Sequence, residues 1–152
     1  CPVEKLTQQG INVSLGTDGA ATNNDLDILG EMRTAAMLGK AVAGDAAAIP
    51  AEQALRMATI NGARALGIDD ETGSLQPGKA ADITAIRLNG LESQPLYHPV
   101  SQLVYATGRN QVTDVWINGK HVLNKRRLTT MDEQEILEKT RRWRDRIMST
   151  DS

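Results

Sequence analysis

The chain has 152 residues and a formal net charge of −2, and its only cysteine is Cys1. It is long enough for one domain with a hydrophobic core. The small net charge gives no indication of a nucleic-acid or anionic-membrane partner. No apolar run reaches the roughly 18 residues that a transmembrane helix needs. A single cysteine excludes an internal disulfide framework and fits a reducing compartment, so we expect a cytoplasmic protein.

The first part of the chain alternates helix and strand signals. Residues 3–9 (VEKLTQQ) predict a short helix that Gly10 ends. Residues 11–16 (INVSLG) form a short apolar run of strand character, and residues 17–25 (TDGAATNND) form a small, polar turn. A helix, a glycine, a strand and a polar turn in this order are typical of an α/β protein with a parallel sheet.

Two helices are predicted next. Asn24 or Asp25 could cap the first of them, over residues 26–42. The second covers residues 51–66 and ends at Gly67. The first helix carries an apolar stripe at spacings of three and four residues: Leu26, Leu29, Met32 and Ala36.

The composition changes near residue 68. Residues 69–82 are rich in turn formers, and residues 81–88 (ADITAIRL) predict a strand. The pattern of residues 100–106 (VSQLVYA) fits either a strand or a short helix. Residue 68 is therefore our predicted domain boundary.

An Asn-Gly pair at residues 118–119 predicts a β-hairpin, because this dipeptide favours the type I′ turn. A two-residue loop would pair Val115 with Val122 and Trp116 with His121.

A last helix is predicted after residue 129. Thr130 and Glu133 have the spacing of a capping box. Acidic residues come first in this helix and arginines follow, which matches the helix dipole. Its predicted buried stripe is Ile136, Thr140, Trp143 and Ile147.

Asp18 is the strongest candidate for chemistry. It follows the end of a predicted strand, where catalytic groups collect in α/β folds. A carboxylate there could bind a metal and accept a proton from metal-bound water. The competing interpretation is a turn aspartate that caps the next helix. Asn23 and Asn24 could donate hydrogen bonds into the same site, although their position favours a turn-forming role.

The other candidate residues carry weaker signals. His98 and His121 form no HxH, HExxH or similar spacing, and Cys1 has no histidine near it in sequence. Glu31 and Arg33 lie inside a predicted helix, where we expect them to be solvated or to form surface pairs. Taken alone, the residues give one promising carboxylate and no complete site.

Three segments resemble the amidohydrolase superfamily. LGTDGAATNNDLDILGEMRTAAMLGK (residues 15–40) is similar to its last barrel strand and the following helix, in particular in the branch of methylthioadenosine/adenosylhomocysteine deaminases and chlorotriazine hydrolases. Residues 54–86 resemble the stretch that leaves the barrel, and VTDVWINGKHVLNKRRL (residues 112–128) resembles the closing hairpin of a small β-sandwich.

The resemblance implies an α/β fold, namely the C-terminal end of a (β/α)8 barrel plus part of a composite β-sandwich. Residues 1–67 would be the end of the barrel and residues 68–128 the sandwich part. Residues 129–152 would be a C-terminal helix.

The resemblance also implies the chemistry. Asp18 would bind one divalent metal, expected to be zinc, help to activate the hydrolytic water and lie beside the substrate. The remaining ligands and a proton-transferring glutamate belong to positions that this chain lacks, so we expect the chain alone to be inactive and to be either a fragment or a separate subunit. Thr22 stands where this branch would have serine, a small difference.

The expected reaction is deamination of an adenine nucleoside, 5′-methylthioadenosine or S-adenosylhomocysteine, by a homo-oligomer. The alternatives are guanine or cytosine deamination, triazine dechlorination, a non-catalytic barrel that serves as an assembly scaffold, or an unrelated α/β domain in which Asp18 caps a helix.

Overall fold

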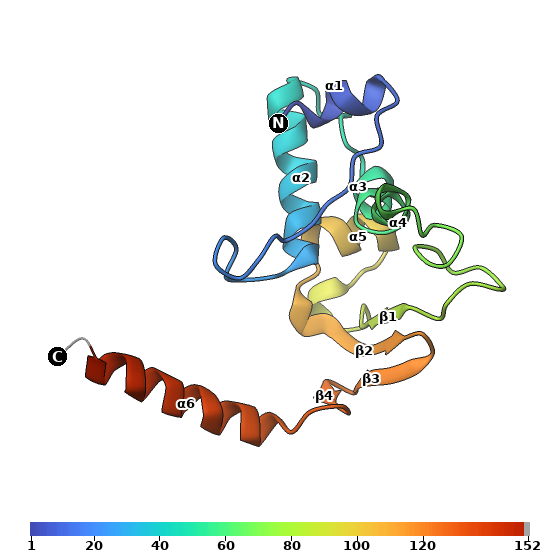
Figure 1. The fold of residues 1–152 in the computed structure, drawn as a ribbon. Helices are drawn as coiled ribbons and strands as arrows, with labels where there is room; N and C mark the ends of the chain where they lie inside the picture. Colours follow the sequence, from blue (N-terminus) through green and yellow to red (C-terminus); the bar gives the residue numbers. More distant parts are fainter. Residues whose placement is uncertain (151–152) are drawn as a thin grey trace.

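The computed structural model describes residues 1–150, in which helices and a small sheet pack together (Figure 1). Two single 3-10 turns, η1 (Leu91–Ser93) and η2 (Arg109–Gln111), join the longer elements. The helices are α1 (Val3–Gln8), α2 (Ile28–Ala43), α3 (Ala51–Met57), α4 (Ile60–Leu66), α5 (Pro99–Ala106) and α6 (Glu133–Thr150), and the strands are β1 (Ile83–Ile86), β2 (Val112–Ile117), β3 (Lys120–Asn124) and β4 (Arg127–Leu128).

Helix α2 forms as predicted but begins later. Its N-cap is Asp27, whose carboxylate accepts a hydrogen bond of 3.0 Å from the backbone N–H of Leu29. The predicted caps, Asn24 and Asp25, lie outside the helix, and so does the exposed Leu26. The remaining stripe residues, Leu29, Met32 and Ala36, are buried as expected.

The predicted helix over residues 51–66 is two helices, α3 and α4, broken between Met57 and Ile60. At the break the carbonyl of Met57 accepts a hydrogen bond of 2.9 Å from Leu15 N. In a continuous helix that carbonyl would instead accept from the N–H of Asn61. The prediction of one helix was wrong because a distant segment takes this acceptor.

Residues 11–16, predicted as a strand, run extended along α3 and α4 and belong to no sheet among residues 1–150. Side-chain amides hold the segment there. Asn61 Nδ2 donates to Val13 O over 3.0 Å, and Asn12 Nδ2 donates to Asn61 O over 2.9 Å. Extended backbone forms a ladder only beside another strand, and no described residue provides one here.

The four strands form one antiparallel sheet in the order β1-β2-β3-β4. The Asn118-Gly119 turn has positive φ at both residues, 48° and 74°, as a type I′ turn requires. Trp116 pairs with His121 as predicted. Val115, however, pairs with Leu123 rather than Val122, because the register shifts between Val115 and Trp116.

The undecided segment 100–106 is helical, and α5 packs with α2 and α3 into one core that includes the fully buried Val104. Ile86 and Val112 attach the sheet to this core. Gly39 is needed where α2 meets the following loop, because a Cβ atom there would lie 2.5 Å from Ile49 Cγ1. The described residues contain one sheet, so a two-sheet sandwich and the boundary at residue 68 stay predictions.

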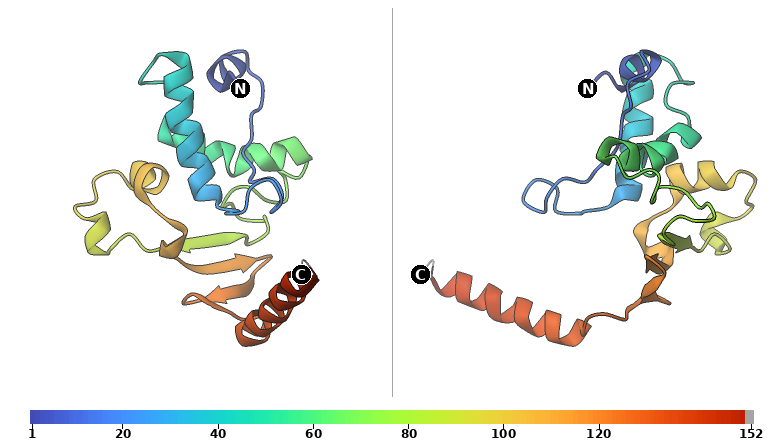
Figure 2. Two further views of the ribbon diagram at one scale, coloured as in Figure 1. Left: turned by 90° about the vertical axis from the view of Figure 1, so that its left-hand side faces the viewer. Right: turned by 45° about the vertical axis from the view of Figure 1, so that its right-hand side comes forward.

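Helix α6 extends away from the rest of the molecule (Figures 1 and 2). Its cap is Asp132, whose Oδ1 accepts from Gln134 N and Glu135 N, so the predicted capping box from Thr130 does not form. The predicted buried stripe is wrong, since every residue of α6 is exposed, Trp143 by 60%. No helix within residues 1–150 is both long and apolar enough to cross a membrane.

Candidate functional site

Asp18 lies in the loop of residues 17–27, which joins the extended segment to α2. Its φ of 60° is in the left-handed region, which aspartate tolerates better than most residues. The side chain is exposed, and Oδ1 accepts a hydrogen bond of 2.6 Å from Gly19 N. Oδ2 has no hydrogen-bond partner among the described residues. Because Asp27 caps α2, the interpretation of Asp18 as a helix cap is wrong.

Backbone and amide hydrogen bonds fix the loop around Asp18. The carbonyl of Gly19 accepts from the N–H groups of Thr22 and Asn23, both over 2.9 Å. The side chain of Asn23 then uses both of its polar atoms: Oδ1 accepts from Asp25 N over 3.2 Å, and Nδ2 donates to Glu31 Oε1 over 2.7 Å. Asn23 therefore has the turn-forming role, and each polar atom of its amide makes a hydrogen bond within the protein.

The far end of the loop is tied to the sheet region. Arg109, in η2, donates from Nη1 to Asp25 O over 2.7 Å and forms a close ion pair with the Asp25 carboxylate. Arg126 Nη1 in turn donates to the carbonyls of Arg109 and Asn110. Because both ion-pair partners are exposed, the pair is worth only about 0–1 kcal/mol to stability. Its effect is to connect two segments that are far apart in the chain.

The histidines and the cysteine lie elsewhere and do not complete a metal site. His121 Nε2 lies 3.0 Å from Asp114 Oδ1, and its ring stacks on Trp116 with centroids 4.3 Å apart. His98 and Cys1 are exposed. Within residues 1–150, no three His, Cys, Asp or Glu side chains are grouped so that they could hold a metal ion. Asp18 can therefore contribute one ligand but not a whole site.

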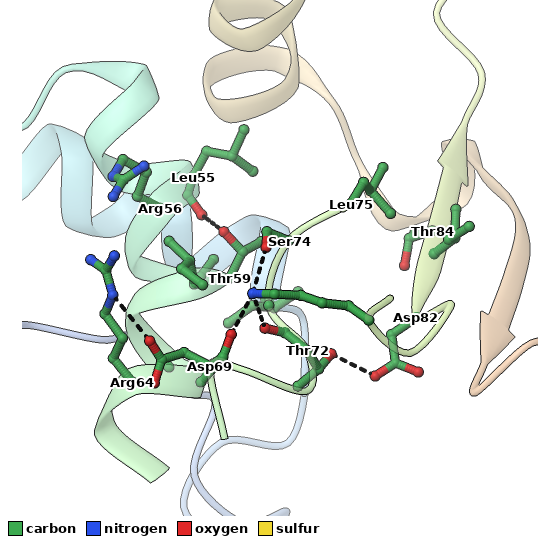
Figure 3. Close-up of a pocket in the computed structure, with 18 of the residues that line it drawn as sticks. Leu55, Arg56, Thr59, Arg64, Asp69, Thr72, Ser74, Leu75, Asp82 and Thr84 are labelled. Carbon is green, nitrogen blue, oxygen red and sulfur yellow. Dashed lines mark hydrogen bonds and ion pairs between the residues drawn. The ribbon is translucent and has the colours of Figure 1, made fainter. Parts of the chain in front are cut away.

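An open groove of about 1140 Å³ is lined mainly by α3, α4, β1 and the loop of residues 68–82 (Figure 3). Asp18 is not among its lining residues. Lys79 reaches across the loop, donating from Nζ to Ser74 Oγ over 2.9 Å and to the carbonyls of Asp69 and Thr72. This ammonium group is thus engaged in holding its own loop.

Asp82, also at the groove, is similarly committed. One carboxylate oxygen accepts from Asn118 N and the other from the Thr72 hydroxyl, each over 2.7 Å. These bonds, that from the Asn118 backbone N–H first, hold the pKa of Asp82 below its ordinary value. Since the side chains of Lys79 and Asp82 are engaged in holding the fold, the Asp18 loop remains the better candidate site.

The sequence did not predict the partners of two α2 residues that were expected to be solvated or in surface pairs. Glu31 binds Asn23, and Arg33 donates from Nη2 to Thr107 O over 2.7 Å. A carboxylate eight residues after an asparagine is a signal that could have suggested the first contact. Nothing in the sequence links Arg109 to Asp25, because 84 residues separate them.

Comparison with known proteins gives a consistent result. The model of the Amidohydrolase family matches residues 1–122. The chain is 53% identical to 5-methylthioadenosine/S-adenosylhomocysteine deaminase of Teredinibacter turnerae, over 97% of this chain and 33% of that protein. It is 40% identical to 5′-deoxyadenosine deaminase of Methanosarcina mazei, over 97% of this chain and 34% of that protein.

Solved structures agree with these relatives. An adenosine deaminase from Xanthomonas campestris with bound zinc superposes with a TM-score of 0.94 at 53% identity, covering 98% of this chain and 34% of that one. Atrazine chlorohydrolase TrzN from Arthrobacter aurescens TC1, complexed with zinc, gives 0.82 at 31% identity, with coverage of 91% and 31%. The chain thus spans about a third of the length of the proteins it matches.

Proposed function

Because the chain belongs to the amidohydrolase family, and spans about a third of the length of its relatives, we propose that the whole protein is a zinc-dependent adenine nucleoside deaminase. The proposed substrates are 5′-methylthioadenosine and S-adenosylhomocysteine. The observation that carries this proposal is the 53% identity, over 97% of the chain, to a deaminase named for both compounds. A homo-oligomeric assembly and a cytoplasmic location remain predictions.

Asp18 is the proposed contribution of this chain to the metal site. Its carboxylate is exposed and has an oxygen without a partner among residues 1–150, which fits one position in a zinc ligand set. Catalytic zinc has about three protein ligands, so the others come from outside these residues. When bound, zinc would supply Lewis acidity and lower the pKa of water toward neutrality.

The proposed reaction assigns Asp18 a proton-transfer role. Asp18 accepts a proton from the attacking water while the water oxygen bonds to the adenine carbon that bears the amino group. As the oxygen bonds, the electron pair of the adjacent C=N bond moves to the ring nitrogen. The C=N bond then re-forms, and the amino group takes up the proton held by Asp18 and leaves as ammonia. Water and the adenine nucleoside are consumed, and ammonia and the corresponding hypoxanthine nucleoside are formed.

The substrate is tested by measuring kcat/KM for 5′-methylthioadenosine, guanine, cytosine and a chlorotriazine, through release of ammonia or chloride. We expect 5′-methylthioadenosine to be preferred by at least about tenfold, which corresponds to about 1.4 kcal/mol of transition-state stabilisation. The chlorotriazine is included because a zinc-containing triazine hydrolase shares the fold at 31% identity.

A tenfold preference for any other compound in the set would contradict the substrate proposal but leave the role of Asp18 standing. No turnover of any of them by a protein that has bound zinc would favour the alternative of a non-catalytic scaffold.

A further inference from the structure

A continuous series of hydrogen bonds runs from the first turn of α2 to Asp18. Glu31 accepts from the side chain of Asn23, and the backbone N–H of Asn23 donates to Gly19 O. The N–H of Gly19 donates to the Asp18 carboxylate. Asn23 is therefore the point at which a helix residue is coupled to the loop that carries Asp18.

The helix end of this series is capped and packed against the core. Asp27 caps α2 four residues before Glu31, and Met32, the neighbour of Glu31, is buried in the core, with only 2% of its surface exposed. Asp18 itself is exposed and has a backbone conformation that few residues adopt. A side chain in such a loop keeps a fixed position only if the surrounding loop is held in place.

We propose that Asn23 is a positioning residue, which acts through Glu31 to hold the Asp18 carboxylate in its productive geometry. This inference rests on the proposed function of Asp18. We assign Asn23 a positioning role rather than direct contact with substrate, because each polar atom of its amide already makes a hydrogen bond within the protein, to Asp25 N and to Glu31. Displacement of a reacting group by about 1 Å can cost roughly 100-fold in rate, so a modest shift of the loop is enough to matter.

The contact with Glu31 depends on which atom donates, and this makes it testable. Asn23→Asp keeps the size of the side chain and its acceptor for Asp25 N, but it places a second carboxylate against Glu31. The double variant Asn23→Asp with Glu31→Gln restores the hydrogen bond with the roles exchanged: the amide at position 31 donates and the carboxylate at position 23 accepts. Glu31→Gln alone keeps an acceptor oxygen for Asn23 and is expected to cost less than Asn23→Asp.

The experiment compares these variants in the whole protein, with Asn124→Asp as the matched control. Asn124 is exposed at the end of β3, so the same change of charge is made far from the loop in sequence. The readouts are kcat and KM for 5′-methylthioadenosine, the melting temperature, and the visible spectrum after zinc is replaced by Co²⁺, which reports on the geometry of the metal ligands.

We expect Asn23→Asp to lower kcat at least about tenfold with little change in KM, and to alter the Co²⁺ spectrum. The double variant is expected to recover most of the lost kcat and most of the wild-type Co²⁺ spectrum. Asn124→Asp is expected to behave as wild type. Activity unchanged in Asn23→Asp, or a double variant no better than the single one, would overturn the proposal.

Two further results complete the test. If Asn23→Asp does not fold, Glu31→Ala is used in its place, because it removes only the acceptor of the Asn23 hydrogen bond. If neither variant folds, the contact has a purely structural role and the proposal is overturned. Asp18→Asn separates the two proposals: if it abolishes turnover while Asn23→Asp does not affect it, the positioning role fails and the proposed function stands.

Discussion

The loops of residues 17–27 and 68–82 are alike in sequence and opposite in their use of charge. Both are turn-rich, and both contain aspartates and glycines. In the second loop, Lys79 donates to groups around it and both carboxylate oxygens of Asp82 accept hydrogen bonds. In the first, backbone groups, the Asn23 amide and the ion pair of Arg109 with Asp25 hold the loop, and the Asp18 carboxylate receives one hydrogen bond, from Gly19 N.

This difference predicts how a structural aspartate can be distinguished from a functional one. A carboxylate that accepts hydrogen bonds at both oxygens has little capacity left to bind a ligand, whereas a carboxylate with an unpartnered oxygen can present it. The position of an aspartate in a turn does not separate these cases, but its hydrogen-bond partners do.

The largest expected effect is that of Asp18→Asn in the whole protein. Asparagine keeps the size of the side chain and tolerates the left-handed backbone, but it removes the charge and the proton acceptor. Turnover should fall by about 10²–10⁴-fold with an unchanged melting temperature. Steady-state kinetics and thermal denaturation of the purified variant measure both quantities, and near-normal turnover would show that Asp18 is no more functional than Asp82.

Lys79→Met should have the opposite profile. Methionine fills a similar volume but cannot donate to Ser74 Oγ or the carbonyl of Asp69, so the loop of residues 68–82 loses its central donor. We expect a loss of about 1–3 kcal/mol in the free energy of unfolding, measured by urea denaturation. Once allowance is made for the unfolded fraction, kcat should be close to wild type. A large fall in kcat of the folded variant would contradict the division between the two loops.

Asp82→Asn should change the acid sensitivity of the fold. Because the folded state holds the pKa of Asp82 below its ordinary value, the unfolded chain binds the proton more readily. Its stabilising contribution is complete above the unfolded pKa, about 3.9, and is lost as pH falls through the folded pKa. The stability difference between wild type and variant should therefore be present at pH 7 and shrink below about pH 4. Urea denaturation at several pH values tests this, and a difference independent of pH would contradict it.

The smallest expected effect is zinc binding by the 152-residue chain alone, which should be negligible. Asp18 offers one carboxylate, whereas catalytic zinc takes about three protein ligands. Elemental analysis after dialysis against a zinc-containing buffer measures the content. One tightly held zinc per chain would contradict this prediction. It would show that the loop of residues 17–27 binds metal without further ligands, and so differs from the loop of residues 68–82 even more than we expect.

Local patterns predicted some of the local structure. The body of α2 and the turn at Asn118-Gly119 follow from apolar spacing and from a dipeptide preference, both of which act over a few residues. The break between α3 and α4 could not be predicted in this way, because it arises when Leu15 takes the carbonyl of Met57.

The candidate site was also predicted only where local sequence determines it. Asp18 was identified as a candidate from its place after an apolar run, but its contacts with other residues were not predicted. The sequence suggested amides near Asp18, yet only the structure separates Asn23, which binds Glu31, from its neighbour Asn24. The tie from Arg109 depends on tertiary packing and leaves no trace in sequence spacing.

The exposure of α6 has a consequence for how the chain melts. An isolated helix of 18 residues is only marginally stable in water, and α6 gains little from packing because all its residues are exposed. It should therefore lose helicity gradually on heating, apart from the cooperative transition of the core. The two tryptophans fall on either side of this division, since Trp143 lies on α6 and Trp116 stacks on His121 in the sheet. Their fluorescence would report two separate thermodynamic units within one short polypeptide.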